Sequence, residues 1–277
     1  MGGATRSRSA QVVAVERAVL TDLGVIDDPF AERLVDPAMA RVLRGVRLLP
    51  AAIQRRSVTL AGLAARVRFH DQQVVSAMDD GIDQVVVLGA GYDSRAWRLA
   101  RRGVRFFEVD HPLTQADKRR RAPSLGPTYV EADLRSTSAA EALGKAGLDA
   151  ARPAVLVAEG LTMYLAEEVV RRQFGDLADA VVPESRLSTD FYPPQDAGSA
   201  RNRRQNALQR LARRGSGEDL HLTVSRDDAV ALVETCGWKV TDSVSTRDAA
   251  CTLLPPAPRL RTGAVNPLKT LLAATRT

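Results

Sequence analysis

The sequence predicts an α/β fold in which a parallel, doubly wound sheet follows a helical N-terminal segment. From residue 84 onward, short apolar runs alternate with segments of helical spacing, which is the pattern of strand–helix–strand units. The first apolar run, 84–88, leads into Gly89 and Gly91 and then Asp93, which stands where a helix N-cap belongs. A buried strand that ends in a glycine turn before a helix is the first half of a nucleotide-binding unit.

Residues 1–80 contain no convincing strand and are expected to form a helical cap. Apolar residues at helical spacing predict helices over 11–23, 38–46 and 58–78, and Asp28-Pro29 marks a turn between the first two.

The alternating region predicts a core over residues 81–254. Strands are expected at 84–88, 104–110, 128–132, 154–158 and 186–190, with helices at 93–101, 112–121, 139–145 and 167–180. After Tyr192-Pro193-Pro194 the polar, arginine-rich residues 195–217 are expected to be an inserted lid. A helix over 226–235 and strands over 237–244 and 250–254 then complete the core, and residues 255–277 are expected to be a tail that carries no core.

The length and composition fit one large α/β domain, or one domain with an appendage, in a reducing cytoplasm. The 277-residue chain is 45% hydrophobic and has two cysteines, Cys236 and Cys251, which is too few for a disulfide scaffold. No apolar run approaches the roughly 20 residues that span a bilayer, and the N-terminus lacks the apolar stretch of a signal peptide. We therefore expect no membrane association.

The net charge of +6 raises the possibility of a nucleic-acid partner. The positive charge is almost all arginine and is scattered, with local clusters at 118–121, 201–204 and 210–214. Aromatic residues make up 4% of the chain, which leaves little for base stacking. Nucleic acid is therefore not an expected partner.

Acidic side chains follow the predicted strands, where open α/β sheets bind ligands. Asp110 stands about 20 residues past the glycine turn, at the distance where an acid reaches a ribose hydroxyl pair; the alternative is a helix N-cap before Pro112. Asp133 is placed to accept from an adenine amine or to cap a helix. Glu159 ends an apolar strand, and a buried carboxylate there needs a cationic partner, for which a ligand ammonium or sulfonium is suited. Ser94 stands where a dinucleotide fingerprint has its third glycine, which favours a different adenosine-containing ligand.

Four of these stretches together resemble one family. They are Leu88-Gly-Ala-Gly-Tyr-Asp93, Phe107-Glu-Val-Asp-His-Pro112, Asp133-Leu-Arg135 and Ala158-Glu-Gly-Leu-Thr-Met-Tyr-Leu165. They are similar, in this order, to the bacterial leucine carboxyl methyltransferase-like group of S-adenosylmethionine-dependent methyltransferases. The resemblance runs from about Arg17, through Asp27-Asp-Pro-Phe30, to about Pro194, and the last third of the chain matches in architecture only.

The resemblance implies a seven-stranded class I methyltransferase core that binds S-adenosyl-L-methionine. It implies that Arg66 holds the methionine carboxylate, although the residues alone favour a solvated helix face for this arginine. By the same resemblance Gly89 lines the cofactor together with the turn residues Gly91 and Asp93. Asp110 takes the ribose hydroxyls, Asp133 and Leu134 bracket the adenine, and Glu159 faces the methionine amino end.

The implied activity is O-methylation of a carboxyl or hydroxyl group on a small molecule, such as a polyketide or another secondary metabolite, by a monomer or a homodimer. A carboxylate acceptor needs no base; a phenol or alcohol does, and His70, His111 and Tyr164 are candidates. Tyr164 and Tyr192 are expected to be aromatic walls near the methyl group.

The same residues leave two alternative functions to consider and give no sign of a metal site. A nicotinamide-dependent dehydrogenase is disfavoured by Ser94 and by the Asp133 and Glu159 pair, and a non-catalytic, basic RNA-binding protein would need the arginines of 201–214 to face away from the cleft. The three histidines have no metal-ligand spacing, so no metal is expected.

Overall fold

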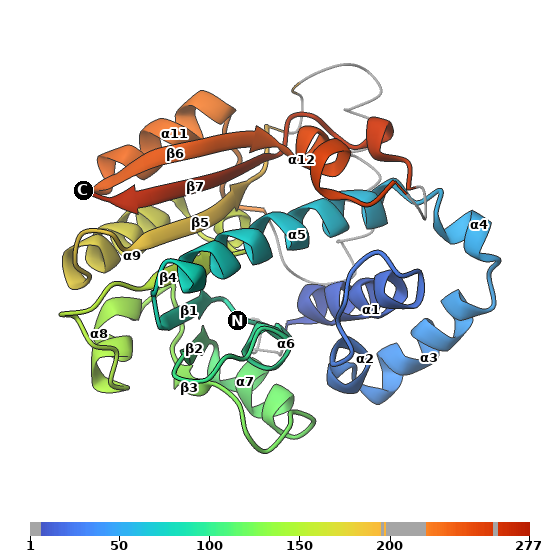
Figure 1. Ribbon diagram of the computed structural model, residues 1–277, viewed down its shortest axis with the longest axis horizontal. Coiled ribbons are helices and arrows are strands. Elements are labelled where there is room, and N and C mark those ends of the chain that lie inside the picture. Colours follow the sequence, from blue (N-terminus) through green and yellow to red (C-terminus); the bar gives the residue numbers. More distant parts are fainter. Residues whose placement is uncertain (1–6, 195–196, 198–219, 257–259) are drawn as a thin grey trace.

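A seven-stranded sheet forms the centre of the protein in a computed structural model that describes residues 7–194, 197, 220–256 and 260–277 (Figure 1). The strand order is β3-β2-β1-β4-β5-β7-β6. The strands are β1 (Gln84–Leu88), β2 (Arg105–Asp110), β3 (Thr128–Glu131), β4 (Val155–Ala158), β5 (Arg186–Phe191), β6 (Trp238–Ser245) and β7 (Thr270–Arg276). Strands β1 to β5 pair in parallel, whereas β7 runs antiparallel to both β5 and β6.

The side chains of β1 explain why it lies at the centre. Its five residues are all buried, and Val86 lies in register with Phe107 on one side and Leu156 on the other. Because successive side chains point to opposite faces, Val86 and Leu88 join the apolar cluster on one face and Val85 joins the cluster on the other. A strand buried on both faces is the usual centre of a parallel sheet, as the sequence predicted.

Helices cover both faces of the sheet. Helices α8 (Ala139–Lys145), α9 (Glu167–Ala180) and α11 (Arg226–Thr235) pack on one face in a single apolar cluster. Helix α5 (Val58–Asp79) runs along the other face, where it contacts β4, β5 and β7 (Figure 1). The remaining helices are α1 (Arg8–Asp22), α2 (Ala31–Leu34), α3 (Pro37–Arg47), α4 (Ala51–Gln54), α6 (Arg95–Arg98), α7 (Pro112–Arg119) and α12 (Thr246–Leu253), and the 3₁₀ turns are η1 (Thr162–Tyr164) and η2 (Thr262–Ala264).

The N-terminal helices pack together on one side of helix α5. Helix α1 contacts α2, α3 and α5, helix α5 contacts α12, and all five contribute to a second apolar cluster. Ser7 begins α1, because its hydroxyl accepts from the backbone N–H of Ala10 at 3.1 Å. None of the described helices is long and apolar enough to cross a membrane.

Two sequence predictions near the C-terminus are wrong. The strand expected at 250–254 belongs to helix α12, which Ser245 caps by accepting from the backbone N–H of Asp248 at 3.1 Å. The supposed tail carries a core strand, because β7 lies between β5 and β6 with Leu271 and Leu272 buried. Elsewhere the helix expected over 93–101 is reduced to the four residues of α6. The lid expected over 195–217 lies outside the described residues, apart from residue 197.

Candidate active site

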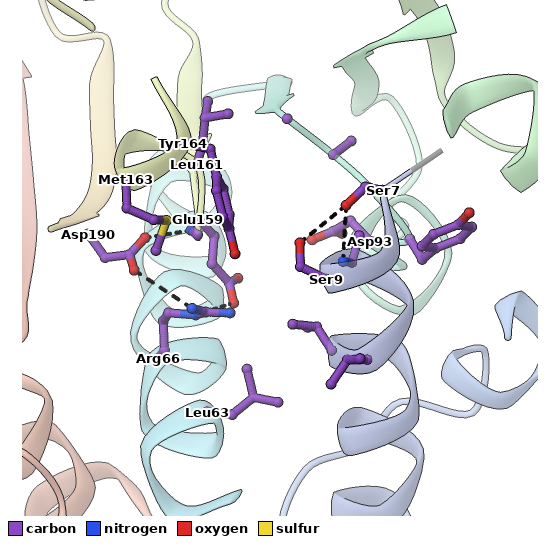
Figure 2. Close-up of a pocket in the computed structure, with 18 of the residues that line it drawn as sticks. Ser7, Ser9, Leu63, Arg66, Asp93, Glu159, Leu161, Met163, Tyr164 and Asp190 are labelled. Carbon is purple, nitrogen blue, oxygen red and sulfur yellow. Dashed lines mark hydrogen bonds and ion pairs between the residues drawn. The ribbon is translucent and has the colours of Figure 1, made fainter. Parts of the chain in front are cut away.

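A cavity of about 800 Å³ opens at the carboxyl ends of β1, β2, β4 and β5. Figure 2 shows it bounded by α1 on one side and α5 on the other, with the strand ends above. Every residue that the sequence predicted as cofactor-binding lines it: Arg66, Gly89, Gly91, Asp93, Asp110, Asp133, Leu134 and Glu159. The position at the strand ends is the usual ligand site of an open α/β sheet.

The glycine turn after β1 allows α1 to approach the cavity closely. Gly89 and Gly91 have φ angles of 59° and 50°, a region that side chains other than glycine rarely adopt. A Cβ atom on Gly91 would lie 2.9 Å from the Cβ of Ala10 at the start of α1. The turn therefore requires glycine both for its backbone angle and for the contact with α1.

A buried arginine ties α1 to this turn. Arg17 pairs with Asp28 and hydrogen-bonds the hydroxyl of Ser94, and its Nη1 donates to the carbonyl of Tyr92 at 3.3 Å. Ser94, which replaces the third glycine of a dinucleotide turn, also donates to Asp28 at 2.7 Å. The stretch Asp27-Asp-Pro-Phe30 thus helps to hold the cap against the glycine turn.

Asp110 lies beside this turn and does not cap a helix. Its Oδ2 accepts from the backbone N–H of Gly91, and its Oδ1 accepts from that of His111 at 2.6 Å. The cap of α7 is His111, whose Nδ1 accepts from the N–H of Leu113 at 3.2 Å. Burial raises the pKa of Asp110 above its usual value. Each carboxylate oxygen keeps a further lone pair, so Asp110 can still accept from a ligand hydroxyl.

Asp133 lies at the end of β3 and pairs with Arg135. Its Oδ1 and Oδ2 each lie 2.9 Å from a guanidinium nitrogen of Arg135, and these hydrogen bonds lower the pKa of Asp133. Asp133 does not cap α8, whose N-cap is Ser138. The neighbouring Leu134 is buried and adds an apolar surface to the same end of the cavity.

Arg66 faces the ends of β4 and β5 from helix α5. Its Nε donates to Glu159 Oε1 at 3.0 Å, and its Nη1 lies 3.8 Å from Asp190 Oδ2. Asp190 is fixed by the backbone N–H of Gly160, which donates to its Oδ1 at 2.6 Å. In Figure 2 the guanidinium group points into the cavity between the two carboxylates. The side chain is 13% exposed, so the solvated helix face that the residues alone favoured is wrong.

The second partner of Glu159 is Arg95, a residue that the sequence analysis missed. Arg95 donates from Nη2 to Glu159 at 2.5 Å, from Nη1 to Asp93 at 2.5 Å and from Nε to Asp71 at 2.8 Å, and its side chain is 1% exposed. Burial alone would raise the pKa of Glu159, but the charges of Arg95 and Arg66 outweigh it and hold that pKa well below its usual value. The cationic partners expected for Glu159 are therefore arginines of the protein.

The residues predicted to act near the methyl group, Tyr164, Tyr192 and His70, do not all lie in the cavity. Tyr164 and Tyr192 line the cavity. His70 is not among the described lining residues: it is fully buried, and its Nδ1 lies 2.7 Å from Ser188 Oγ in a hydrogen bond. Burial also lowers the pKa of His70, which favours the neutral imidazole. His70 is therefore a buried neighbour of Asp190 and is not in contact with a ligand in the cavity.

The C-terminal region contributes to the cavity, which the sequence analysis did not foresee. Val265, Asn266 and Lys269 lie in the segment that leads into β7, and all three line the cavity. Lys269 Nζ lies 4.1 Å from the centre of the Tyr192 ring. The one sequence feature that could have indicated this placement is the apolar run 271–274, which is compatible with a strand.

The basic residues of the cluster 118–121 pair with neighbouring carboxylates. Lys118 pairs with Glu108 at 2.5 Å in the core, and Arg120 and Arg121 both pair with Asp117. Arg119 lies 3.7 Å from Glu131. All four cations of this cluster thus have a carboxylate partner, and the clusters 201–204 and 210–214 lie outside the described residues. Within the part of the chain that the structure describes, no three histidine, cysteine or acidic side chains gather in a group that could hold a metal ion.

Comparison with known proteins decides the family. Residues 10–178 match the leucine carboxyl methyltransferase family. The chain belongs to this family. A Frankia alni protein named as an S-adenosyl-L-methionine-dependent methyltransferase is 34% identical over 269 residues, which cover 90% of this chain and 86% of that protein.

Solved structures agree on the fold. A methyltransferase from Thermobifida fusca YX has a TM-score of 0.62 at 20% identity, over 98% of this chain and 96% of that one. A DUF574-family protein from Streptomyces avermitilis has a TM-score of 0.63 at 16% identity, over 98% of both chains. The family member described here is thus an S-adenosylmethionine-dependent methyltransferase with a class I methyltransferase sheet, as the resemblance implied.

Proposed function

We propose that this enzyme methylates an oxygen, in a carboxyl or hydroxyl group, on a small molecule such as a secondary metabolite of the polyketide class. One observation carries the proposal. A single cavity joins a polar end at the strand ends, suited to the cofactor, to a more apolar end between α1 and α5. Small-molecule sites commonly have such apolar walls with few polar groups.

The polar end fits S-adenosylmethionine by its donors and acceptors. Asp110 offers a half-buried carboxylate to the two ribose hydroxyls, and Asp133 with Leu134 offers an acceptor and an apolar wall to the adenine. Arg66 offers a guanidinium to the methionine carboxylate. Glu159 and Asp190 lie beside it and favour the positively charged amino group. The turn of Gly89, Gly91 and Asp93 supplies the floor of this end.

The apolar end is suited to the acceptor. Tyr164 and Tyr192 line the cavity. Leu63 lies about one turn before Arg66 on α5 (Figure 2). When bound, the cofactor would supply a methyl group on its sulfonium sulfur: an acceptor oxygen would form the new C–O bond as the C–S bond breaks and S-adenosylhomocysteine leaves. Catalysis by the chain then consists of aligning the acceptor and excluding water.

The positions of the candidate bases favour a carboxylate acceptor. His70 lies behind the cavity wall, and His111 uses its Nδ1 to cap α7. Among the three candidate bases, only Tyr164 lines the cavity near Arg66 (Figure 2). A carboxylate needs no base, since it is already ionised at neutral pH.

The proposal is tested by methyl transfer from S-adenosylmethionine labelled in its methyl group to a panel of carboxylic acids, phenols and alcohols. Methyl esters release labelled methanol in mild base, whereas methyl ethers do not, so the product distinguishes the two acceptor groups. We expect base-labile product with the wild type and none with Asp110→Ala. Labelled product that is stable to base and formed on nitrogen or carbon would contradict O-methylation.

A further inference from the structure

We propose that the ammonium group of Lys269 binds the carboxylate of the methyl acceptor. This inference rests on the proposed function, which favours a carboxylate acceptor, and names the residue that recognises it.

The other cations of the cavity wall already have anionic partners. Arg17 pairs with Asp28, Arg66 pairs with Glu159, and Arg135 pairs with Asp133. Among the described residues, Lys269 is the one lining lysine or arginine with no carboxylate within 4.0 Å. Its described partner is the face of the Tyr192 ring, at 4.1 Å. A ring face attracts a cation but leaves its charge to be balanced by an anion.

The backbone of Lys269 is held in place before any acceptor binds. Its carbonyl accepts from the backbone N–H of Thr246 at 2.9 Å and from the Thr246 hydroxyl at 3.2 Å. Just before it, Asn266 Oδ1 accepts from the N–H of Leu268 at 2.9 Å and orders the turn into β7. Side chains whose backbone is fixed lose less entropy when they bind a ligand.

Lys269 belongs to the acceptor end of the cavity. A Cβ on Gly62, four residues before Arg66 on α5, would lie 3.6 Å from Val265 and 3.9 Å from Thr246, the residue that fixes Lys269. Tyr192 links the two ends, because its ring contacts Lys269 and it lies close enough to Arg66 to affect the pKa of that guanidinium.

Apolar walls make an unbalanced charge costly at this position. Val58, Leu63 and Val265 give the cavity apolar walls, and Lys269 itself is half-buried. A cation that is partly removed from water gains by pairing with an anion that enters the same site. An acceptor with an apolar body and a carboxylate fits both features.

The inference is tested by calorimetric titration of the enzyme saturated with S-adenosylhomocysteine. The probes are acid and amide pairs of the same shape: benzoate with benzamide, 2-naphthoate with 2-naphthamide, and decanoate with decanamide. For at least one pair we expect the acid to bind the wild type at least ten-fold more tightly than its amide. Lys269→Met should reduce this preference to less than about three-fold, and Lys269→Arg should restore most of it, because arginine keeps the charge.

A matched control separates recognition from a general charge effect. Lys239→Met makes the same substitution on an exposed lysine of β6 and should leave the preference unchanged. Retained binding of S-adenosylhomocysteine by Lys269→Met shows that the variant is folded. The inference is overturned if no acid binds more tightly than its amide, or if the preference survives Lys269→Met, while S-adenosylhomocysteine still binds. Failure of S-adenosylhomocysteine to bind the wild type would instead overturn the proposed function, and this inference with it.

Discussion

Arg95→Met is expected to destabilise the enzyme far more than the loss of an ordinary surface ion pair. Arg95 is buried and pairs with Asp71, Asp93 and Glu159. Methionine fills a similar volume but leaves these carboxylates short of positive charge. Removing one partner from a buried pair costs about 3–5 kcal/mol. For a chain of roughly this size that corresponds to a fall in Tm on the order of 10 °C.

The assay is urea unfolding at pH 7, with Arg101→Met as the matched control. Arg101 pairs with Asp79 at 2.6 Å on the surface, where both side chains are exposed, so its loss should cost less than about 1 kcal/mol.

The loss of unfolding free energy in Arg95→Met should also depend on pH. The arginines lower the folded-state pKa of Glu159 below its unfolded value near 4.5, so this stabilisation is present above pH 4.5 and is lost as the pH falls. The difference in unfolding free energy between the wild type and Arg95→Met should therefore become smaller below pH 4.5. A free energy of unfolding within about 1 kcal/mol of wild type at pH 7 would refute the reasoning.

Three further changes test the turn, the C-terminal strand and a buried acid. Gly91→Ala should weaken S-adenosylhomocysteine binding more than ten-fold, because its Cβ would push α1 away, whereas Gly103→Ala, also at positive φ but facing open space, should leave binding unchanged; calorimetry measures both. Leu272→Ala in β7 should cost about 2–5 kcal/mol of unfolding free energy, and Leu113→Ala, half-exposed on α7, less than about 1 kcal/mol; equal losses would contradict a core role for β7. Burial raises the pKa of Glu108 from 4.5 to about 7, so the free energy of unfolding should fall as the pH rises across that interval. In urea unfolding between about pH 5 and 8, Glu108→Gln should make the free energy of unfolding depend less on pH. An unchanged pH dependence would show that another group titrates.

The parallel core could be predicted because its signals are local. Strands β1 and β4 are short apolar runs, and the carboxylates at or after the strand ends reach one edge of the sheet by topology alone. Helix α12 was mistaken for a strand because its apolar residues are few and its cap at Ser245 was overlooked. Strand β7 was missed because a short apolar run after several prolines has no local feature that places it between β5 and β6.

The site was predictable where a residue type and its position at a strand end were enough, as for Asp110 and Glu159. The role assigned to Arg66 came from family resemblance, and the structure adds its contact with Glu159. Arg95 and Lys269 were missed because their importance lies in partners distant along the chain: Glu159 is 64 residues from Arg95, and Lys269 meets Tyr192 only because β5 and β7 pair. His70 was predicted as a candidate base, but it is buried behind the cavity. The sequence does not show which way a histidine on α5 faces.

The measurement that tests the central claim most directly is a calorimetric titration with S-adenosylhomocysteine, and in parallel with NADH, on wild type and Asp110→Ala. The account predicts that S-adenosylhomocysteine binds the wild type and NADH does not, and that Asp110→Ala loses the binding while its thermal unfolding shows a folded protein. Binding of NADH alone, or unchanged affinity for S-adenosylhomocysteine in Asp110→Ala, would contradict the cofactor site described here.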